Sequence, residues 1–205
     1  MLIPFDELFK RWRLSFTGVL HIGANVGEER FMYDKLGIKK QIWIEGNPDI
    51  FLTLKENISY NQHAVALNYL IGDENKESVL HESNNGSQSS SVLDLGYHKI
   101  DHPDVHYVRD IPLQMYRIDS LDLDLSGVDL LNIDLQGAEL MALKGMGDII
   151  KQFKAIYLEV NKKELYTGCP LVEDLDLFLL GFGFRRVETK FCGAFSWGDA
   201  LWINK

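Results

Sequence analysis

Basic residues are scarce in this chain. Its 205 residues include 21 Lys and Arg against 30 Asp and Glu, which gives a formal net charge of −9. A protein that binds nucleic acid through the phosphates needs a basic surface, so the composition argues against DNA or RNA as a partner.

Cysteines and long apolar runs are also rare. Cys169 and Cys192 are the only cysteines and do not form a CxxC pair, which argues against a thiolate zinc site and a disulfide framework. No apolar run approaches the ~20 residues of a membrane span, and the first residues lack the pattern of a signal peptide. These absences predict a reduced, cytoplasmic protein without a membrane span.

The remaining composition is that of a soluble globular protein. Hydrophobic residues make up 46% and charged residues 25% of the chain. The length suits one domain, so we predict a single domain over residues 1–205. Within it, apolar residues at helical spacing predict a short amphipathic helix in residues 1–16.

Apolar runs alternate with segments of helical period. We predict strands at 17–22, 41–45, 63–71, 129–134, 155–160, 184–189 and 198–205, and helices at 26–37, 47–60, 138–150 and 171–183. Asn47 and Pro48 give the second of these helices a strong start signal. Strands that alternate with helices predict an α/β fold with a mostly parallel sheet covered on both faces.

Residues 73–118 break the alternation. We predict a short strand or hairpin near 77–82, a long loop, and a strand at 112–118. Loops of this length in compact domains are often functional. Residues 82–110 are therefore a candidate loop or lid over the site where an acceptor substrate would bind.

The stretch VLHIGANVGEER, residues 19–30, predicts a tight turn at the end of the first strand. A dinucleotide site requires GxGxxG, but Asn25 replaces the middle glycine, and Glu28 and Glu29 place negative charge where a pyrophosphate would bind. Glu45 ends the next strand roughly 20 residues later, which suits the hydroxyls of an adenosine ribose. S-adenosylmethionine fits this site better than a phosphate-bearing cofactor, and an NAD-linked oxidoreductase stays as the alternative.

Six stretches together resemble the FkbM-type family of S-adenosylmethionine-dependent methyltransferases. They are HIGANVGEE (21–29), IEGNPDIF (44–51), LIGDENKE (70–77), NIDLQGAELMALKGM (132–146), IYLEV (156–160) and GDALWI (198–203). The resemblance runs from about Thr17 to the C-terminus. Two positions depart from it: Gln136 stands where the family has Glu, and His21 stands where many methyltransferases have an acid.

The resemblance implies a class I methyltransferase (Rossmann-like) fold: a three-layer α/β sandwich with a seven-stranded sheet whose last strand is antiparallel. It also implies methyl transfer to oxygen, often on a sugar or natural-product hydroxyl. The implied cofactor-binding residues are Gly23, Ala24, Asn25 and Gly27 at the methionine part, Glu45 and Asn47 at the ribose, Ile71, Gly72 and Asp73 at the adenine, and Asp134 near the sulfonium. His21 is a further structural or cofactor-contacting candidate.

Transfer to a hydroxyl benefits from a positioned base. Asp134, Glu139 and Glu159 lie at or just past predicted strand ends, and Asp134 is the preferred base. Alternatively, Asp134 only holds the cofactor, Glu139 complements a helix dipole, and Glu159 binds loop amides. The reaction requires no metal, although a divalent ion at these three carboxylates stays open.

Histidine is the other natural base near neutral pH. His98, His102 and His106 recur every four residues, but Pro103 interrupts any helix that would align them. His98 and His102 are candidate bases, with exposed loop histidines as the alternative.

The polar segment 84–91 supplies hydroxyls and amides, including Ser89, that suit a polyhydroxylated acceptor or the cofactor carboxylate. A solvated linker is the alternative. We therefore predict an S-adenosylmethionine-dependent O-methyltransferase acting on a glycan or a sugar-containing small molecule. A non-catalytic cofactor-binding protein of the same fold stays as the second alternative.

Overall fold

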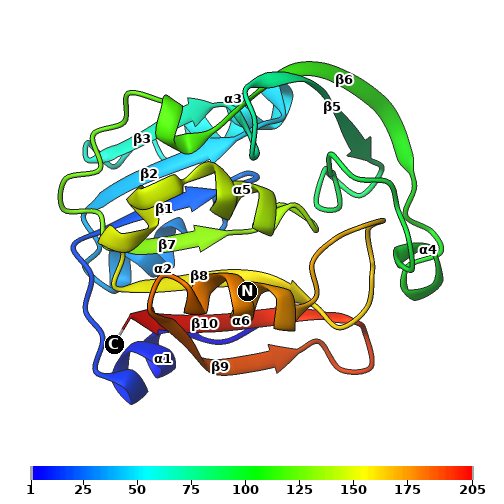
Figure 1. Ribbon diagram of the computed structural model, residues 1–205. Coiled ribbons are helices and arrows are strands. Elements are labelled where there is room, and N and C mark those ends of the chain that lie inside the picture. Colours follow the sequence, from blue (N-terminus) through cyan, green and yellow to red (C-terminus); the bar gives the residue numbers. More distant parts are fainter. Residues whose placement is uncertain (1, 205) are drawn as a thin grey trace.

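A seven-stranded sheet forms the centre of the computed structural model, which describes residues 2–204 (Figure 1). In spatial order its strands are β3 (Ala64–Asn68), β2 (Lys40–Glu45), β1 (Gly18–Ile22), β7 (Leu130–Ile133), β8 (Ala155–Asn161), β10 (Trp197–Asn204) and β9 (Phe184–Phe191). Strand β10 runs antiparallel to both of its neighbours, and all the other pairs are parallel. The predicted seven-stranded sheet with an antiparallel last strand is confirmed.

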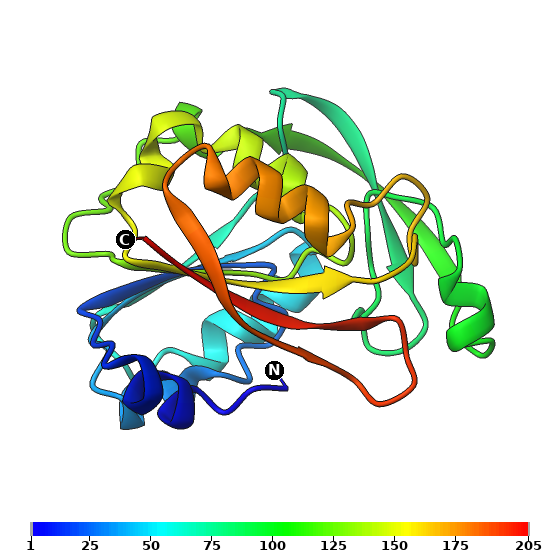
Figure 2. The same cartoon turned by 60° about the horizontal axis from the view of Figure 1, so that its bottom comes forward.

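Helices cover both faces of this sheet. The helices are α1 (Phe5–Trp12), α2 (Arg30–Lys35), α3 (Pro48–Asn57), α4 (His98–Asp101), α5 (Glu139–Gly145) and α6 (Val172–Leu180), with short 3-10 turns at Ile118–Ser120 and Gly147–Gln152. Leu143 of α5 and Leu175 of α6 pack on one face of the sheet, whereas Phe5 of α1, Tyr33 of α2 and Leu54 of α3 pack on the other. Figure 2 shows these three layers, with α1 in dark blue opposite α6 in orange. The central strands are buried on both faces, which explains their continuous apolar sequences.

Several predicted elements are shorter than expected. The amphipathic helix at the N-terminus occupies only Phe5–Trp12 of residues 1–16, because Arg13 takes a left-handed conformation that ends it. Helix α2 begins at Arg30 and not at residue 26, since Asn25 and Gly27 have φ angles of 45° and 75° that a right-handed helix does not allow.

A second, three-stranded sheet lies beyond the carboxyl ends of the parallel strands. Its order is β4 (Leu70–Ile71), β6 (Tyr107–Tyr116) and β5 (Lys76–Ser83). The predicted strand 63–71 therefore divides: β3 joins the main sheet and β4 pairs with β6. The predicted loop 82–110 is also shorter, because Ser83 pairs with Tyr107 and extends the β5–β6 hairpin.

Residues 84–106 connect the two strands of the hairpin and include α4. They lie at the carboxyl ends of the parallel strands of the main sheet (Figure 1). No helix among residues 2–204 is long and apolar enough to cross a membrane. Cys169 and Cys192 are both free.

Candidate functional site

A cavity of about 420 Å³ opens at the carboxyl ends of β1, β2, β7 and β8. This is the edge where open parallel sheets bind ligands. Eleven of the predicted site residues line the cavity: His21, Gly23, Ala24, Asn25, Glu45, Ile71, Ser89, His98, His102, Asp134 and Glu159. Five others lie outside its lining: Gly27, Asn47, Gly72, Asp73 and Glu139.

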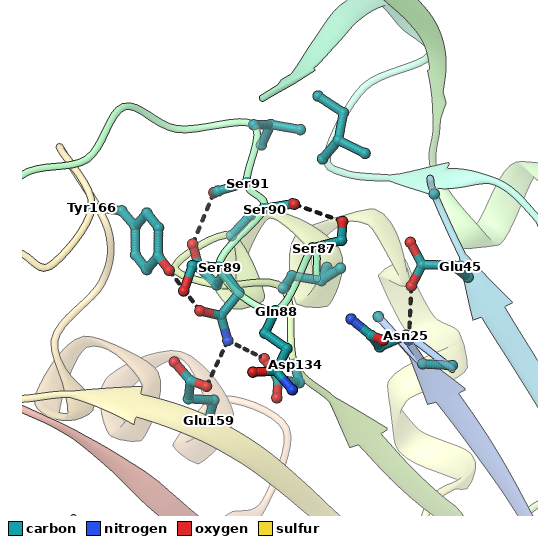
Figure 3. A pocket seen from close by; sticks show the side chains of 18 of the residues that line it. Asn25, Glu45, Ser87, Gln88, Ser89, Ser90, Ser91, Asp134, Glu159 and Tyr166 are labelled. Carbon is teal, nitrogen blue, oxygen red and sulfur yellow. Dashed lines mark hydrogen bonds between the residues drawn. The ribbon is translucent and has the colours of Figure 1, made fainter. Parts of the chain in front are cut away.

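The turn after β1 brings backbone close to backbone. Gly23 has φ 78°, and a Cβ at this position would lie 1.8 Å from the carbonyl oxygen of Asp134. Only glycine fits that approach. Asn25 is also left-handed, and its amide donates to Oε2 of Glu45 at 2.8 Å (Figure 3). Gly27 has a packing role instead, because a Cβ there would lie 2.8 Å from Leu54.

Glu45 joins the ends of β1 and β2. Its second oxygen, Oε1, accepts from the amide of Asn47 at 2.7 Å. Burial raises the pKa of Glu45 to about 6. Because each carboxylate oxygen has two lone pairs and Glu45 lines the cavity, the side chain retains acceptor capacity toward a ligand.

Asn47 supports the cavity from behind. Its Oδ1 caps α3 by accepting from the amides of Asp49 and Ile50, as its sequence position predicted. Its Nδ2 donates to Glu82 at 2.8 Å and to Ser87 at 3.1 Å. Asn47 therefore fixes the serine-rich segment relative to the main sheet.

The residues of segment 84–91 bond mainly to one another. Oγ of Ser87 and Oγ of Ser90 are 2.7 Å apart, and Nδ2 of Asn85 donates to Ser89 at 3.0 Å. Ser91 donates to the backbone carbonyl of Gln136 at 2.8 Å. Figure 3 shows the segment passing across the cavity between Glu45 and Tyr166. This segment is an ordered wall and not a solvated linker.

Gln136 connects the two carboxylates at the ends of β7 and β8. Its Nε2 donates to Oδ1 of Asp134 at 2.6 Å and to Oε2 of Glu159 at 2.8 Å, while its Oε1 accepts from the hydroxyl of Tyr166 at 2.5 Å. Gln136 has φ 52°, so the turn after β7 directs this side chain between the acids.

Asp134 and Glu159 also share a hydrogen bond. Burial raises the pKa of both carboxyls, and the charge of Asp134 raises the pKa of Glu159 further. Two carboxyls that share a hydrogen bond hold one proton between them, so Glu159 carries the proton and Asp134 is ionised.

Glu139 is fully buried beneath the turn after β7. Its Oε1 accepts from the amides of Leu135 and Gly137 at 2.9 and 3.1 Å, and its Oε2 has no partner. Burial raises its pKa to about 7. The structure therefore places Glu139 as a support for the turn, away from the cavity surface.

His21 is buried at the end of β1. Its Nδ1 lies 3.2 Å from the hydroxyl of Tyr33, and its ring lies 5.0 Å from that of Trp43. Burial lowers the pKa of His21 to about 3, so the imidazole is neutral. His21 combines a structural role with a place in the cavity wall.

Two of the three histidines of the hairpin connection lie together, since the ring centroids of His98 and His102 are 4.8 Å apart. His98 is only 4% exposed and its Nδ1 has no partner, while burial lowers its pKa to about 4. His102 stacks on Phe195 with ring centroids 4.7 Å apart. His106 lies outside the cavity lining. Within residues 2–204, no group of three or more His, Cys, Asp or Glu side chains is arranged to hold a metal ion.

Of the three residues predicted to bind the adenine, only Ile71, at the end of β4, lies in the cavity lining. Ile71 lines the cavity, whereas a Cβ at Gly72 would lie 2.2 Å from the sulfur of Met115. Asp73 lies outside the lining and has a buried oxygen, Oδ1, without a partner.

Sequence reasoning did not assign Tyr166 or Glu29 to the site. Both line the cavity, together with Trp197, and burial raises the pKa of Glu29 to about 7. Only the contact between Tyr166 and Gln136 reveals the role of Tyr166, because no motif marks that position.

Comparisons with known proteins identify the family and the fold. A family model described as the methyltransferase FkbM domain matches residues 21–186. No curated protein sequence matches the chain.

Solved structures share the fold at low sequence identity. An S-adenosylmethionine-dependent methyltransferase from Aquifex aeolicus is 15% identical with a TM-score of 0.51, and the match covers 98% of this chain and 89% of that one. The magnesium protoporphyrin IX methyltransferase from Synechocystis PCC 6803, solved with bound S-adenosylmethionine, is 9% identical with a TM-score of 0.52, covering 98% and 76%. M. capricolum TrmK, solved with S-adenosylhomocysteine, is 8% identical with a TM-score of 0.51, covering 100% and 70%.

Proposed function

Because the chain belongs to the FkbM methyltransferase family, we propose that it methylates a hydroxyl of a sugar or of a sugar-containing small molecule. S-adenosylmethionine is the cofactor, and methyl transfer from it is the general activity of the family. Our proposal concerns the atom that is methylated, an oxygen, and the class of the acceptor, a sugar.

The cavity fits this cofactor. Asn25, which replaces the middle glycine of a dinucleotide motif, and Glu28 and Glu29 on the cavity wall make a poor environment for a pyrophosphate. Glu45 offers acceptor oxygens to a ribose, and the hydroxyls of segment 84–91 offer donors to the carboxylate of a methionine. When bound, S-adenosylmethionine supplies an electrophilic methyl group on a cationic sulfonium.

The observation that carries the proposal is the network of Gln136, Asp134 and Glu159. A hydroxyl must lose its proton as its oxygen bonds to carbon, and a positioned base accelerates that step by roughly 10²–10⁴-fold. Gln136 bonds to Oδ1 of Asp134 and keeps the ionised carboxylate in place. Asp134 then accepts the hydroxyl proton, while Glu159 retains its own.

His98 has an orienting role in this scheme. Its ring is neutral and lines the cavity, and its buried Nδ1 has no partner, so a hydrogen bond from another hydroxyl of the acceptor would satisfy it. The acceptor is thereby oriented with one hydroxyl toward Asp134. Orientation of this kind supplies much of the rate enhancement in displacement reactions.

Product analysis tests the proposal. The protein is incubated with methyl-labelled S-adenosylmethionine and a panel of glycosides and glycosylated small molecules, and products are examined by mass spectrometry and NMR. We expect the labelled methyl group on an oxygen of the acceptor. Transfer to nitrogen or carbon would contradict the proposal, and cofactor binding without transfer to any acceptor would favour a non-catalytic role.

A further inference from the structure

The cavity wall carries charge of one sign. Five acidic side chains line it: Glu28, Glu29, Glu45, Asp134 and Glu159. Within residues 2–204, no Lys or Arg belongs to this lining. Burial keeps the imidazoles of His21 and His98 neutral by lowering their pKa values to about 3 and about 4. The imidazole of His102 is the remaining basic group of this lining, so acidic side chains predominate and the interior has a negative potential.

Asp134 and Glu159 lie on the part of the wall beside which we propose that the acceptor binds. Glu159 is only 7% exposed, and its Oε2 contacts the neutral amide of Gln136. None of the ion pairs between described residues includes Asp134 or Glu159. A negative group brought beside this pair would meet repulsion at short range in a poorly solvated site.

A second feature of the same wall is a buried polar atom without a partner. His98 is 4% exposed, yet its Nδ1 has no hydrogen-bond partner, and buried polar atoms are ordinarily satisfied. Its ring lies 5.4 Å from that of Tyr166, whose hydroxyl bonds to Gln136. A hydroxyl or amine of the acceptor would satisfy this nitrogen.

Donors suited to an anion lie elsewhere. The hydroxyls and amides of segment 84–91 are neutral, and the cofactor itself brings one carboxylate for them to bind. The Tyr166 hydroxyl already donates to Gln136 and is therefore not free to bind a further anion.

We propose that the part of the acceptor entering this cavity carries no negative charge: the site takes a neutral or amine-bearing sugar ring and excludes uronic acids and sugar phosphates. This inference rests on the proposed function, because it assumes that the acceptor is a polyol bound beside Asp134. Selection occurs through repulsion from the ionised carboxylate of Asp134, which is therefore a specificity-determining residue.

Three matched glycosides test the inference: methyl β-D-glucopyranoside, its 2-amino analogue and its uronate. Dissociation constants are measured by NMR titration on the protein saturated with S-adenosylhomocysteine. We expect the amine to bind at least as tightly as the neutral glycoside, and the uronate to bind at least about tenfold more weakly. Equal binding of all three, a preference for the uronate, or no binding by any of them would overturn the proposal.

Variants locate the source of the selectivity. Asp134→Asn, which removes the ionised carboxylate, should reduce the ratio of uronate to amine dissociation constants by about tenfold, and Asp134→Ser should act in the same direction if Asp134→Asn folds poorly. Glu56→Gln removes one carboxylate from the exposed surface of α3, outside the cavity lining, and should leave the ratio unchanged. An unchanged ratio in both cavity variants would overturn the proposal.

Cofactor binding and product analysis show whether a negative result concerns the charge selectivity or the proposed methyl transfer. If the cofactor product binds and neutral hydroxyls are methylated while the charge order fails, only the charge selectivity is wrong. If glycosides bind in the predicted order but no methyl group reaches oxygen, the proposed function fails.

Discussion

Glu45→Gln is the most informative single change at the cofactor end of the site. The substitution preserves the size of the side chain but removes its charge and turns one acceptor oxygen into an NH₂ donor. Both oxygens of Glu45 now accept from backbone amides, those of Asn25 at 2.8 Å and Asn47 at 2.7 Å. The new NH₂ must therefore face one of these N–H groups, donor against donor.

The expected loss of cofactor affinity follows from these contacts. A hydrogen bond to a charged group contributes about 1.5–3 kcal/mol. Glutamine retains one acceptor for the ribose, so we expect a net loss of about 2–3 kcal/mol, or a Kd raised about 30-fold to 150-fold. The free energy of unfolding of the cofactor-free protein should change less, because loss of an amide partner is offset by removal of a carboxyl whose pKa burial has raised to about 6.

Calorimetric titration with S-adenosylhomocysteine provides the measurement, with Glu56→Gln as the control for net charge. Urea unfolding of both variants checks that the fold persists. A Kd for Glu45→Gln within about threefold of the unmodified protein would refute the assignment of Glu45 to the ribose.

Three further predictions concern the turns and the buried acids. Gly23→Ala places a Cβ 1.8 Å from the Asp134 carbonyl oxygen at φ 78°, so we expect a loss of about 2–4 kcal/mol in unfolding free energy, and an unchanged urea midpoint would contradict the reasoning. Gln136→Leu should lower kcat about tenfold to hundredfold with the Kd of S-adenosylhomocysteine within about threefold; an unchanged kcat would exclude a positioning role. Burial raises the pKa values of Glu29 and Glu139 from 4.5 to about 7, so the folded state binds more protons than the unfolded state between these values. Stability of the cofactor-free protein should therefore fall as pH rises from about 4.5 to about 7 and level off above, and urea midpoints that rise across this window would disprove it.

The sequence predicted those features of the fold that depend on residues close together in the chain. Continuous apolar runs identified the buried parallel strands, because both faces of those strands are covered. Asn47 and Pro48 located the start of α3, since cap chemistry acts over a few residues. Gly23 and Glu45 marked the cavity because the ends of adjacent parallel strands meet at one edge.

Features that depend on tertiary contacts were harder to predict. Nothing before Leu70 signals that the chain leaves the main sheet to pair with β6. Glu139 has the same type of sequence position as Asp134, and only packing places one beneath the turn and the other on the cavity wall. The bond between Gln136 and Tyr166 joins residues far apart in sequence, so no local pattern encodes it.

The most direct test of the central claim compares two properties of Asp134→Asn. Asparagine preserves the acceptor for Gln136 but cannot take a proton from a hydroxyl. The account predicts a single-turnover methyl-transfer rate lower by roughly 10²–10⁴-fold, with the Kd of S-adenosylhomocysteine within about tenfold of the unmodified protein. A transfer rate equal to that of the unmodified protein would contradict the claim that Asp134 is the base.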